Sequence, residues 1–281
     1  MDGAHVVTAR WHRSDPAKYQ GLLRKLDQPG SALEHTMRGV DRRQLGTYFE
    51  ALIRTWIDAL PPTRLTASNW QVYAGENTLG EFDLIFERNT RVFHWELALK
   101  FYLGHPAPDG QFRWYGTNPT DRLDRKWAKM RGHQLRLPRH PAGQGALQVL
   151  GIDEAVTSRA FIKGYLFTPL DDSFAVEYPP DINPAAPRGW WVHLGRLASY
   201  KDRLDGDGQR RWLRLPRQRW LSPARIDDGD RLCEFDTLNS ILADDRSSLV
   251  VGVEETKRGL QEVTRGFVVP DRWPHGDSFP L

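Results

Sequence analysis

The sequence predicts an α/β fold in which helices flank a central mixed sheet. Three observations predict it. Apolar residues recur at helical spacing over residues 41–60, and three segments with strand character follow directly. A second apolar stripe at helical spacing begins near residue 120, and a further strand follows it. The resulting order is helix, three-strand meander, helix, strand.

The first helix ends at Pro61-Pro62, because proline cannot continue a helix. Strands are expected over residues 70–74, 79–87 and 92–103, separated by turn residues at 75–77 and 88–90. Residues 104–119 read as a loop. The second helix carries Leu123, Trp127, Met130 and Leu137 on one stripe, and strands are expected at 146–152, 161–170, 248–254 and 266–270.

Three regions are expected along the chain. Residues 1–40 form an N-terminal extension with a short helix near 19–26, and residues 41–170 form the core. The residue composition changes after Pro169, where prolines become frequent and a stretch rich in Arg and Trp follows. Residues 171–281 are therefore expected to form a basic, aromatic C-terminal extension that packs on the core.

Composition excludes several classes of protein. The 281 residues are 40% hydrophobic and 27% charged, which is an ordinary globular balance. One cysteine, Cys233, excludes an internal disulfide framework and a Cys-based zinc cluster, and no disulfide-linked partner is expected. The charged N-terminal residues do not resemble a signal peptide, and no run approaches the ~20 apolar residues of a membrane helix. We therefore expect a cytoplasmic protein with no membrane partner.

Two adjacent strands carry acids within otherwise apolar runs. Strand alternation places Glu81, Asp83 and Ile85 on one face, opposite Phe82, Leu84 and Phe86. On the next strand Glu96, Ala98 and Lys100 share a face. A buried carboxylate is costly unless it is paired or binds a metal. These acids predict either a site for a hard divalent cation or an ion pair of Lys100 with Glu96 or Asp83.

Glu50 adds a third acid from the first helix. It lies beside the apolar stripe and can lean over the sheet, with Gly46 allowing close approach of the backbones. Its alternatives are an i,i+4 pair with Arg54 or a solvated flank. A helix acid, a strand Asp, and a strand Glu with a Lys form a set that resembles the PD-(D/E)XK nuclease superfamily.

Within that superfamily the chain is similar to a bacterial family known as a numbered domain of unknown function, eighteen-fifty-three. The resemblance extends over nearly the whole chain from about Leu45. It rests on residues 45–50 (LGTYFE), 79–83 (LGEFD), 94–104 (HWELALKFYLG), Asn118, 121–124 (DRLD), Lys126, 133–135 (HQL), 163–167 (KGYLF), 188–191 (RGWW), 215–216 (LP) and 220–223 (WLSP).

The superfamily resemblance implies a restriction-endonuclease-like core and a role for each acid. Asp83 and Glu96 would hold Mg²⁺ or Mn²⁺, Lys100 would be the motif lysine, and Glu50 the auxiliary helix acid. The superfamily places its acid and lysine two residues apart, whereas Glu96 and Lys100 are four apart, ~13 Å of strand rather than ~7 Å. Either Glu96 reaches across one pleat, a bulge shortens the gap, or metal binding is lost.

Three further residues are candidate supports for this site. Glu81 shares the face of Asp83, and the second helix contributes Gln134, a buried-amide candidate, and Lys126. The resemblance implies that this helix helps to line the active site. The alternatives are that Gln134 caps a neighbouring backbone group and that Lys126 is solvated.

Residues 188–225 carry a local positive charge that the whole-chain value of +3 conceals. Nine arginines and one lysine stand against three aspartates, which gives +7 here and leaves −4 elsewhere. Such a stretch is typical of nucleic-acid binding, with Arg on phosphates and aromatic rings on bases. The alternative is a solvated basic face over a tryptophan core. The candidate contacts are Arg188, Trp190, Arg210, Arg211, Arg214 and Arg217.

These features together predict a metal-dependent hydrolase that cleaves DNA phosphodiester bonds. The alternative is a catalytically inactive nuclease-fold module that binds nucleic acid or a protein partner through residues 188–225. A third class is a carboxylate-pair hydrolase that acts on a substrate other than nucleic acid.

Overall fold

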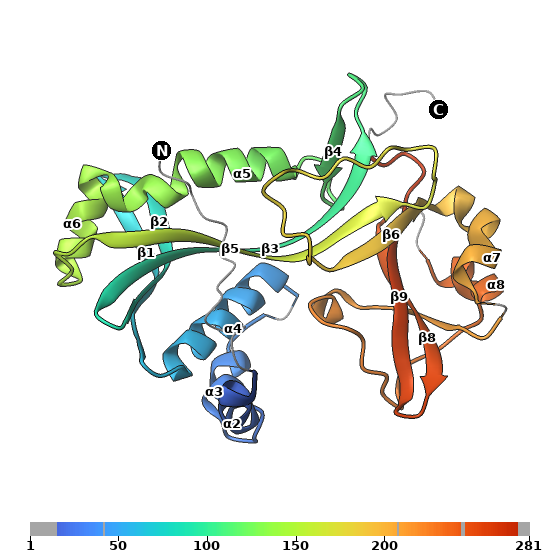
Figure 1. Ribbon diagram of the computed structural model, residues 1–281, viewed down its shortest axis with the longest axis horizontal. Coiled ribbons are helices and arrows are strands. Elements are labelled where there is room, and N and C mark those ends of the chain that lie inside the picture. The colour runs from blue at the N-terminus through green and yellow to red at the C-terminus, as the bar shows by residue number, and fades with distance from the viewer. Residues whose placement is uncertain (1–15, 42, 207, 243–244, 275–281) are drawn as a thin grey trace. The chain divides into compact units, whose positions relative to one another are not determined.

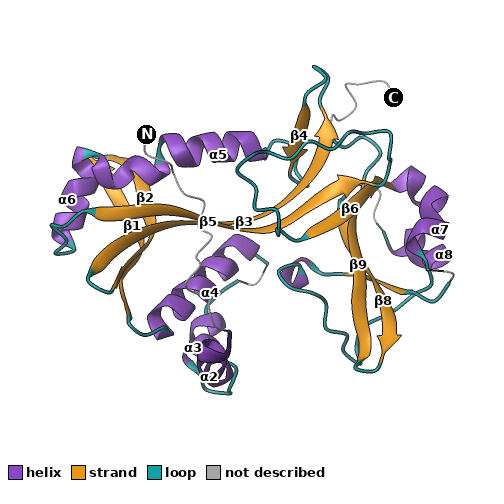
Figure 2. Ribbon diagram, viewed as in Figure 1, coloured by secondary structure: helices purple, strands orange, loops and turns teal. Residues whose placement is uncertain are grey.

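A computed structural model describes residues 16–41, 43–206, 208–242 and 245–274, and it has a mixed α/β fold with a large mixed sheet (Figures 1 and 2). The chain divides into two compact units. The first comprises residues 1–99 and 126–163, and the second comprises residues 100–125 and 164–281. The first unit thus holds most of the predicted core of 41–170, while 100–125 and 164–170 belong to the second.

The first unit contains helices on both sides of its strands (Figure 1). Strand order is β1-β2-β3-β5, and left-handed backbone at Asn89 and Thr90 makes the tight β2–β3 turn. Its elements are α2 (Pro16–Leu26), α3 (Ala32–Arg38), α4 (Leu45–Ala59), β1 (Thr63–Ala74), β2 (Asn77–Arg88), the first part of β3 (Arg91–Pro106), most of α5 (Leu123–Gly132), the 3₁₀ helix η1 (Gln134–Arg139), α6 (Pro141–Val149) and the first part of β5 (Val156–Pro169).

Two apolar layers cover the sheet of the first unit. Leu137 of η1 and Leu147 of α6 pack with Ile85 in one buried cluster. On the α4 side Phe49 stacks on Phe161, whose ring lies 4.8 Å from that of Trp95. Burial of this surface holds α4, η1 and α6 in place, since each apolar side chain removed from water contributes roughly 1.5–3 kcal/mol.

The second unit contains the later residues of β3 and β5. Its strand order is β3-β5-β6-β9-β8-β7, with β4 paired to β3. The β5–β6 and β6–β9 pairs are parallel, whereas β8 is antiparallel to both β7 and β9. Its elements are β4 (Phe112–Tyr115), β6 (Arg188–His193), η2 (Leu194–Tyr200), α7 (Lys201–Leu204), β7 (Arg211–Arg214), η3 (Arg217–Arg219), α8 (Phe235–Leu238), η4 (Asn239–Ile241), β8 (Ser248–Thr256) and β9 (Gly259–Val269).

Several expectations from the sequence need correction. Residues 146–152 were expected as a strand, but α6 occupies 141–149, because Pro141 begins a helix whose Ala142 N–H donates to the His140 ring. The expected loop 104–119 contains β4. The second helix ends at Gly132 and continues as η1, which contains Pro138. Across the described residues, no helix is both long enough and apolar enough to cross a membrane.

Candidate active site

Asp83 and Glu96 occupy the point where the pairing of β2 with β3 ends. The last paired residues are Leu84 and Trp95, and one further step in the same register sets Asp83 opposite Glu96. There the N–H of Leu97 donates to Oδ2 of Asp83 over 2.7 Å. A side-chain carboxylate thus accepts the hydrogen bond of a strand N–H that a backbone carbonyl would otherwise accept. The predicted strict alternation fails at this point, because Phe82 joins Ile85 in one buried cluster.

Glu96 is fully buried and both of its oxygens are engaged. Nε2 of Gln134 donates to Oε2 over 2.5 Å, and Nε2 of His94 lies 2.8 Å from Oε1. The other ring nitrogen of His94 lies 3.2 Å from Oγ of Ser158. Burial lowers the pKa of His94 to about 4, so its ring is neutral at physiological pH. The ring fixes the orientation of the Glu96 carboxyl without supplying a counter-charge.

The two carboxyls hold protons far more tightly than exposed acids do. Burial, followed by the charge of Glu96, raises the pKa of Asp83 to about 7. Burial raises the pKa of Glu96 to about 8, although the charge of Lys126 and a hydrogen bond with Asp83 oppose this rise. Two neighbouring acids with these values retain protons near neutrality rather than both being ionised. The pair therefore carries less than its full two negative charges at neutral pH.

Lys126 and Glu50 complete the surroundings of the pair. Nζ of Lys126 donates to Oε1 of Gln134 over 3.3 Å, and the lysine charge lowers the pKa of both Glu96 and Glu50. Burial raises the pKa of Glu50 on α4, which also has a side-chain hydrogen bond with Asn69. The helix acid, the strand acids and the α5 lysine thus belong to one electrostatic cluster.

Glu81 and Gly46 were also expected to contribute to the site. Glu81 accepts a hydrogen bond from Gln71, and its charge raises the pKa of Asp83, Glu96 and Glu50. Gly46 was expected to permit close backbone approach, yet a Cβ added there would meet no atom within 4 Å. Its presence on α4 therefore has no packing explanation.

Lys100 belongs to the second unit, where it has its own acid. Its Nζ donates to Oδ2 of Asp121 over 2.6 Å, and the hydroxyl of Tyr102 donates to the other oxygen of Asp121 over 3.1 Å. The partner is thus Asp121, not the Glu96 or Asp83 that the strand alternation suggested. Within the first unit, the lysine whose charge acts on Glu96 is Lys126.

The carboxylates of the cluster can be compared with the ligands that Mg²⁺ requires. Among the described residues no group of three or more His, Cys, Asp or Glu side chains is arranged to hold a metal ion. Mg²⁺, however, commonly takes one or two protein carboxylates and completes its shell with water and substrate oxygens. A carboxylate oxygen that accepts one hydrogen bond retains a further lone pair. Asp83 and Glu96 therefore fit a two-carboxylate Mg²⁺ site and do not fit a closed protein cage.

Three residues of the cluster were missed in the sequence. His94 lies two residues before Glu96, so strand alternation could have revealed it on the same face. Ser158 comes from β5 and Asn69 from β1, and neither has a sequence signal. Only the pairing of distant strands brings them to the acids.

The tryptophans of the basic stretch form core. Trp190, Trp191, Trp212 and Trp220 are each at most 8% exposed. The indole N–H of Trp190 donates to Thr264 over 2.8 Å, and burial of the ring hides its faces from a nucleic-acid base. Burial of the rings agrees with a tryptophan core beneath a basic surface.

The arginines of this stretch differ in their partners. Arg210 pairs with Glu254 at 2.8 Å and Arg211 with Glu234 at 3.4 Å, whereas Arg188 lies over the ring of Tyr178. Arg214 donates to a backbone carbonyl, and Arg217 lies over Trp220. Arg188, Arg214 and Arg217 therefore carry charge that no described carboxylate neutralises, whereas Arg210 and Arg211 are paired.

Fold and site define a mixed α/β protein with a carboxylate cluster on adjacent strands around the buried Glu96. The chain belongs to the family described as Domain of unknown function (DUF1853), which it matches over residues 2–269. No curated protein and no solved structure matches the chain.

Proposed function

We infer that this protein is a metal-dependent nuclease that hydrolyses DNA phosphodiester bonds, with Asp83 and Glu96 as the metal-holding residues. The observation that carries the proposal is the pair of the half-buried Asp83 with the fully buried Glu96, because acids with raised pKa values beside a lysine are a frequent signature of an active site. The resemblance of the helix acid and strand acids to the PD-(D/E)XK superfamily supports the choice of DNA.

Each protein group has a distinct role in this proposal. Mg²⁺ or Mn²⁺, when bound, would supply Lewis-acid stabilisation of charge on the phosphate. Leu97 N–H orients Asp83, and His94 and Gln134 orient Glu96. Lys126 supplies fixed positive charge for a phosphate oxygen, in place of the motif lysine.

Glu50 is the candidate general base for the attacking water. Its pKa is raised by burial, which makes its carboxylate a better proton acceptor than an exposed glutamate. The charge of Lys126 opposes this rise and favours the carboxylate form of Glu50. Glu50 is thereby suited to take a proton from water while Lys126 faces the developing negative charge.

The direct test incubates the full chain with supercoiled, linear and branched DNA in Mg²⁺, in Mn²⁺ and in EDTA. Cleavage is expected only with metal, and Asp83→Asn or Glu96→Gln should reduce its rate at least ~100-fold. Asp58→Asn removes an exposed carboxylate from α4 and should cleave normally. Intact DNA under every metal condition, or equal cleavage by Asp83→Asn, would refute the proposal.

A second pair of variants tests the assignment of the lysine. Lys126→Met should abolish cleavage, because it removes the charge that acts on Glu96 and Glu50. Lys100→Met breaks the pair with Asp121 and should retain cleavage. The reverse result would return the role to Lys100 and leave the metal site itself unaffected.

The second candidate function is a module that binds nucleic acid or a protein partner without cutting. The pairing of the motif-position lysine, Lys100, with Asp121 rather than with the strand acids favours it. Salt-sensitive DNA binding that is indifferent to metal and to Asp83→Asn, without any cleavage, would support this alternative.

A further inference from the structure

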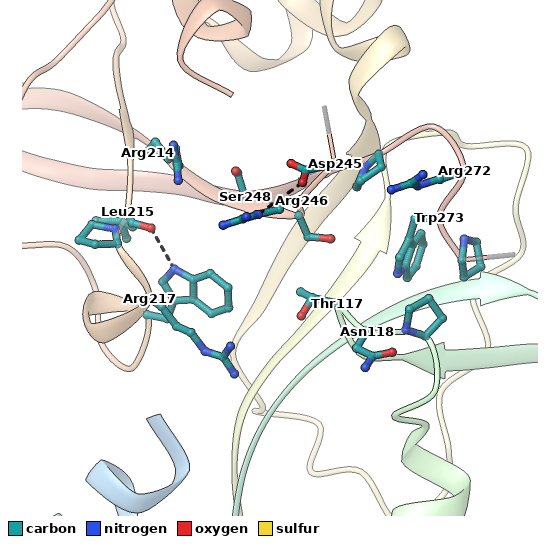
Figure 3. Close-up of a pocket in the computed structure, with 16 residues that line it drawn as sticks. Thr117, Asn118, Arg214, Leu215, Arg217, Asp245, Arg246, Ser248, Arg272 and Trp273 are labelled. Carbon is teal, nitrogen blue, oxygen red and sulfur yellow. Dashed lines mark hydrogen bonds and ion pairs between the residues drawn. The ribbon is translucent and has the colours of Figure 1, made fainter. Parts of the chain in front are cut away.

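The second unit contains a pocket of about 610 Å³ with an unusual concentration of arginine. Four arginines and one aspartate are its charged lining residues, which leaves a formal charge of +3. Figure 3 shows Arg214, Arg217, Arg246 and Arg272 around the pocket, with Thr117 and Asn118 on another side of it. This volume lies within the ~300–1,000 Å³ typical of small-ligand sites.

The pocket arginines are weakly neutralised. Among the described residues Arg214 donates to the carbonyl of Ile241, at 3.3 Å, and to no carboxylate, and Arg217 lies 5.7 Å from the Trp220 ring centroid. Arg246 lies 3.5 Å from an exposed Asp245 carboxylate, and Arg272 has no ion pair or hydrogen bond within the described part of the chain. Guanidinium groups that line one pocket without tight carboxylate partners create a positive local field that favours an anion.

The frame of the pocket is held by buried groups. The indole of Trp220 donates to the carbonyl of Leu215 over 3.0 Å, and that of Trp273 donates to Gly116 over 3.2 Å. Arg265, itself 4% exposed, donates to the carbonyl of Trp220 over 3.1 Å. These contacts fix the rings that line the pocket, so the arginines extend from a preorganised surface.

Asn118 adds a neutral donor. Its side-chain oxygen accepts from the N–H and the hydroxyl of Thr120, at 3.1 and 2.9 Å. This orientation leaves the amide nitrogen of Asn118, an obligate donor, for a ligand. Guanidinium and amide donors around one cavity match the oxygens of a phosphate group.

We propose that this pocket binds a phosphate group of a nucleic-acid strand. This binding site is separate from the proposed cleavage site, and the proposal rests on the proposed function only in the choice of nucleic acid as the ligand. The binding residues are Arg214, Arg217, Arg246, Arg272 and Asn118. Of these, only Arg214 and Arg217 belong to the basic stretch recognised in the sequence.

The test measures fluorescence anisotropy of a labelled single-stranded DNA oligonucleotide with the full chain in EDTA, so that metal and cleavage play no part. Arg217→Gln and Arg272→Gln should each weaken binding about tenfold, because a charge-assisted hydrogen bond is lost. Each should also reduce the slope of log affinity against log salt by about one.

Arg203→Gln is the matched control. It removes the same charge from the same stretch, but Arg203 pairs with Asp172 and does not line the pocket. Unchanged thermal unfolding of all three variants would show that they fold. Equal losses of affinity in the control and the pocket variants, or affinity unchanged by Arg217→Gln and Arg272→Gln, would overturn the proposal.

A competition experiment distinguishes a phosphate of a nucleic-acid strand from that of a free nucleotide or from inorganic phosphate. AMP and inorganic phosphate should displace the oligonucleotide only at concentrations far above that of competing unlabelled oligonucleotide. Displacement by AMP at a concentration similar to that of the oligonucleotide would identify a free nucleotide as the ligand and overturn the strand assignment. Because binding is measured without metal, its failure and a failure of cleavage are separate results.

Discussion

Replacing Glu96 with glutamine should make the protein less sensitive to alkaline pH. The folded state binds the Glu96 proton more tightly than the unfolded chain does, because burial raises its pKa from 4.5 to about 8. This stabilisation is complete below about pH 4.5 and is lost as pH rises through 8. At ~1.4 kcal/mol per pKa unit, the loss from this group is about 5 kcal/mol.

Glutamine suits the same cavity. It is neutral and nearly isosteric, its oxygen can accept from Gln134, and its amide can donate to His94 if the neutral ring changes tautomer and donates to Ser158. The variant should therefore resemble the wild type near pH 4.5. By about pH 9 it should be more stable by several kcal/mol, because it has no carboxylate to ionise in the interior.

Urea unfolding at a series of pH values in EDTA measures this effect. The free energy of unfolding of the wild type should fall as pH rises, and the fall should be about 5 kcal/mol smaller in Glu96→Gln. Glu87→Gln is the control on β2, where Glu87 pairs with Arg64 at the surface and should change stability little. Parallel pH profiles for wild type and Glu96→Gln would refute the buried-acid reasoning.

Three further outcomes are expected. Mg²⁺ affinity, measured by calorimetry, should rise with pH through 7–8 with release of protons, and a pH-independent affinity or its retention in Asp83→Asn would count against the site. In α6, Gly143→Ala should destabilise the folded protein, because the added Cβ would lie 1.9 Å from the carbonyl oxygen of Leu137. Gly145→Ala should stabilise it by ~0.5–1 kcal/mol, and similar urea midpoints for the two variants would contradict this. Arg265→Met should cost ~3–5 kcal/mol in urea unfolding, since it leaves the partly buried Glu262 carboxylate without its arginine, and a loss below 1 kcal/mol would disagree.

Local patterns in the sequence determined the elements around the acids. The apolar stripe and Pro61-Pro62 defined α4 to within a few residues at its start, and the alternating runs with their turn residues located β2 and β3. These signals succeed because side-chain periodicity is a property of neighbouring residues. The same approach failed at residues 146–152, where a short apolar run fits a helix and a strand equally well.

The partners of the charged side chains were decided only by tertiary structure. Strand alternation puts Lys100 on the same face as Glu96, yet Lys100 pairs with Asp121 and the charge of Lys126 acts on Glu96. Likewise, the basic stretch was visible in composition, but the approach of residues 117–118, 245–248 and 270–274 to Arg214 and Arg217 was not. Sequence fixes which charges exist and their local spacing, whereas the long-range strand pairing decides which charges meet, because Coulomb and hydrogen-bond energies depend on distances in space.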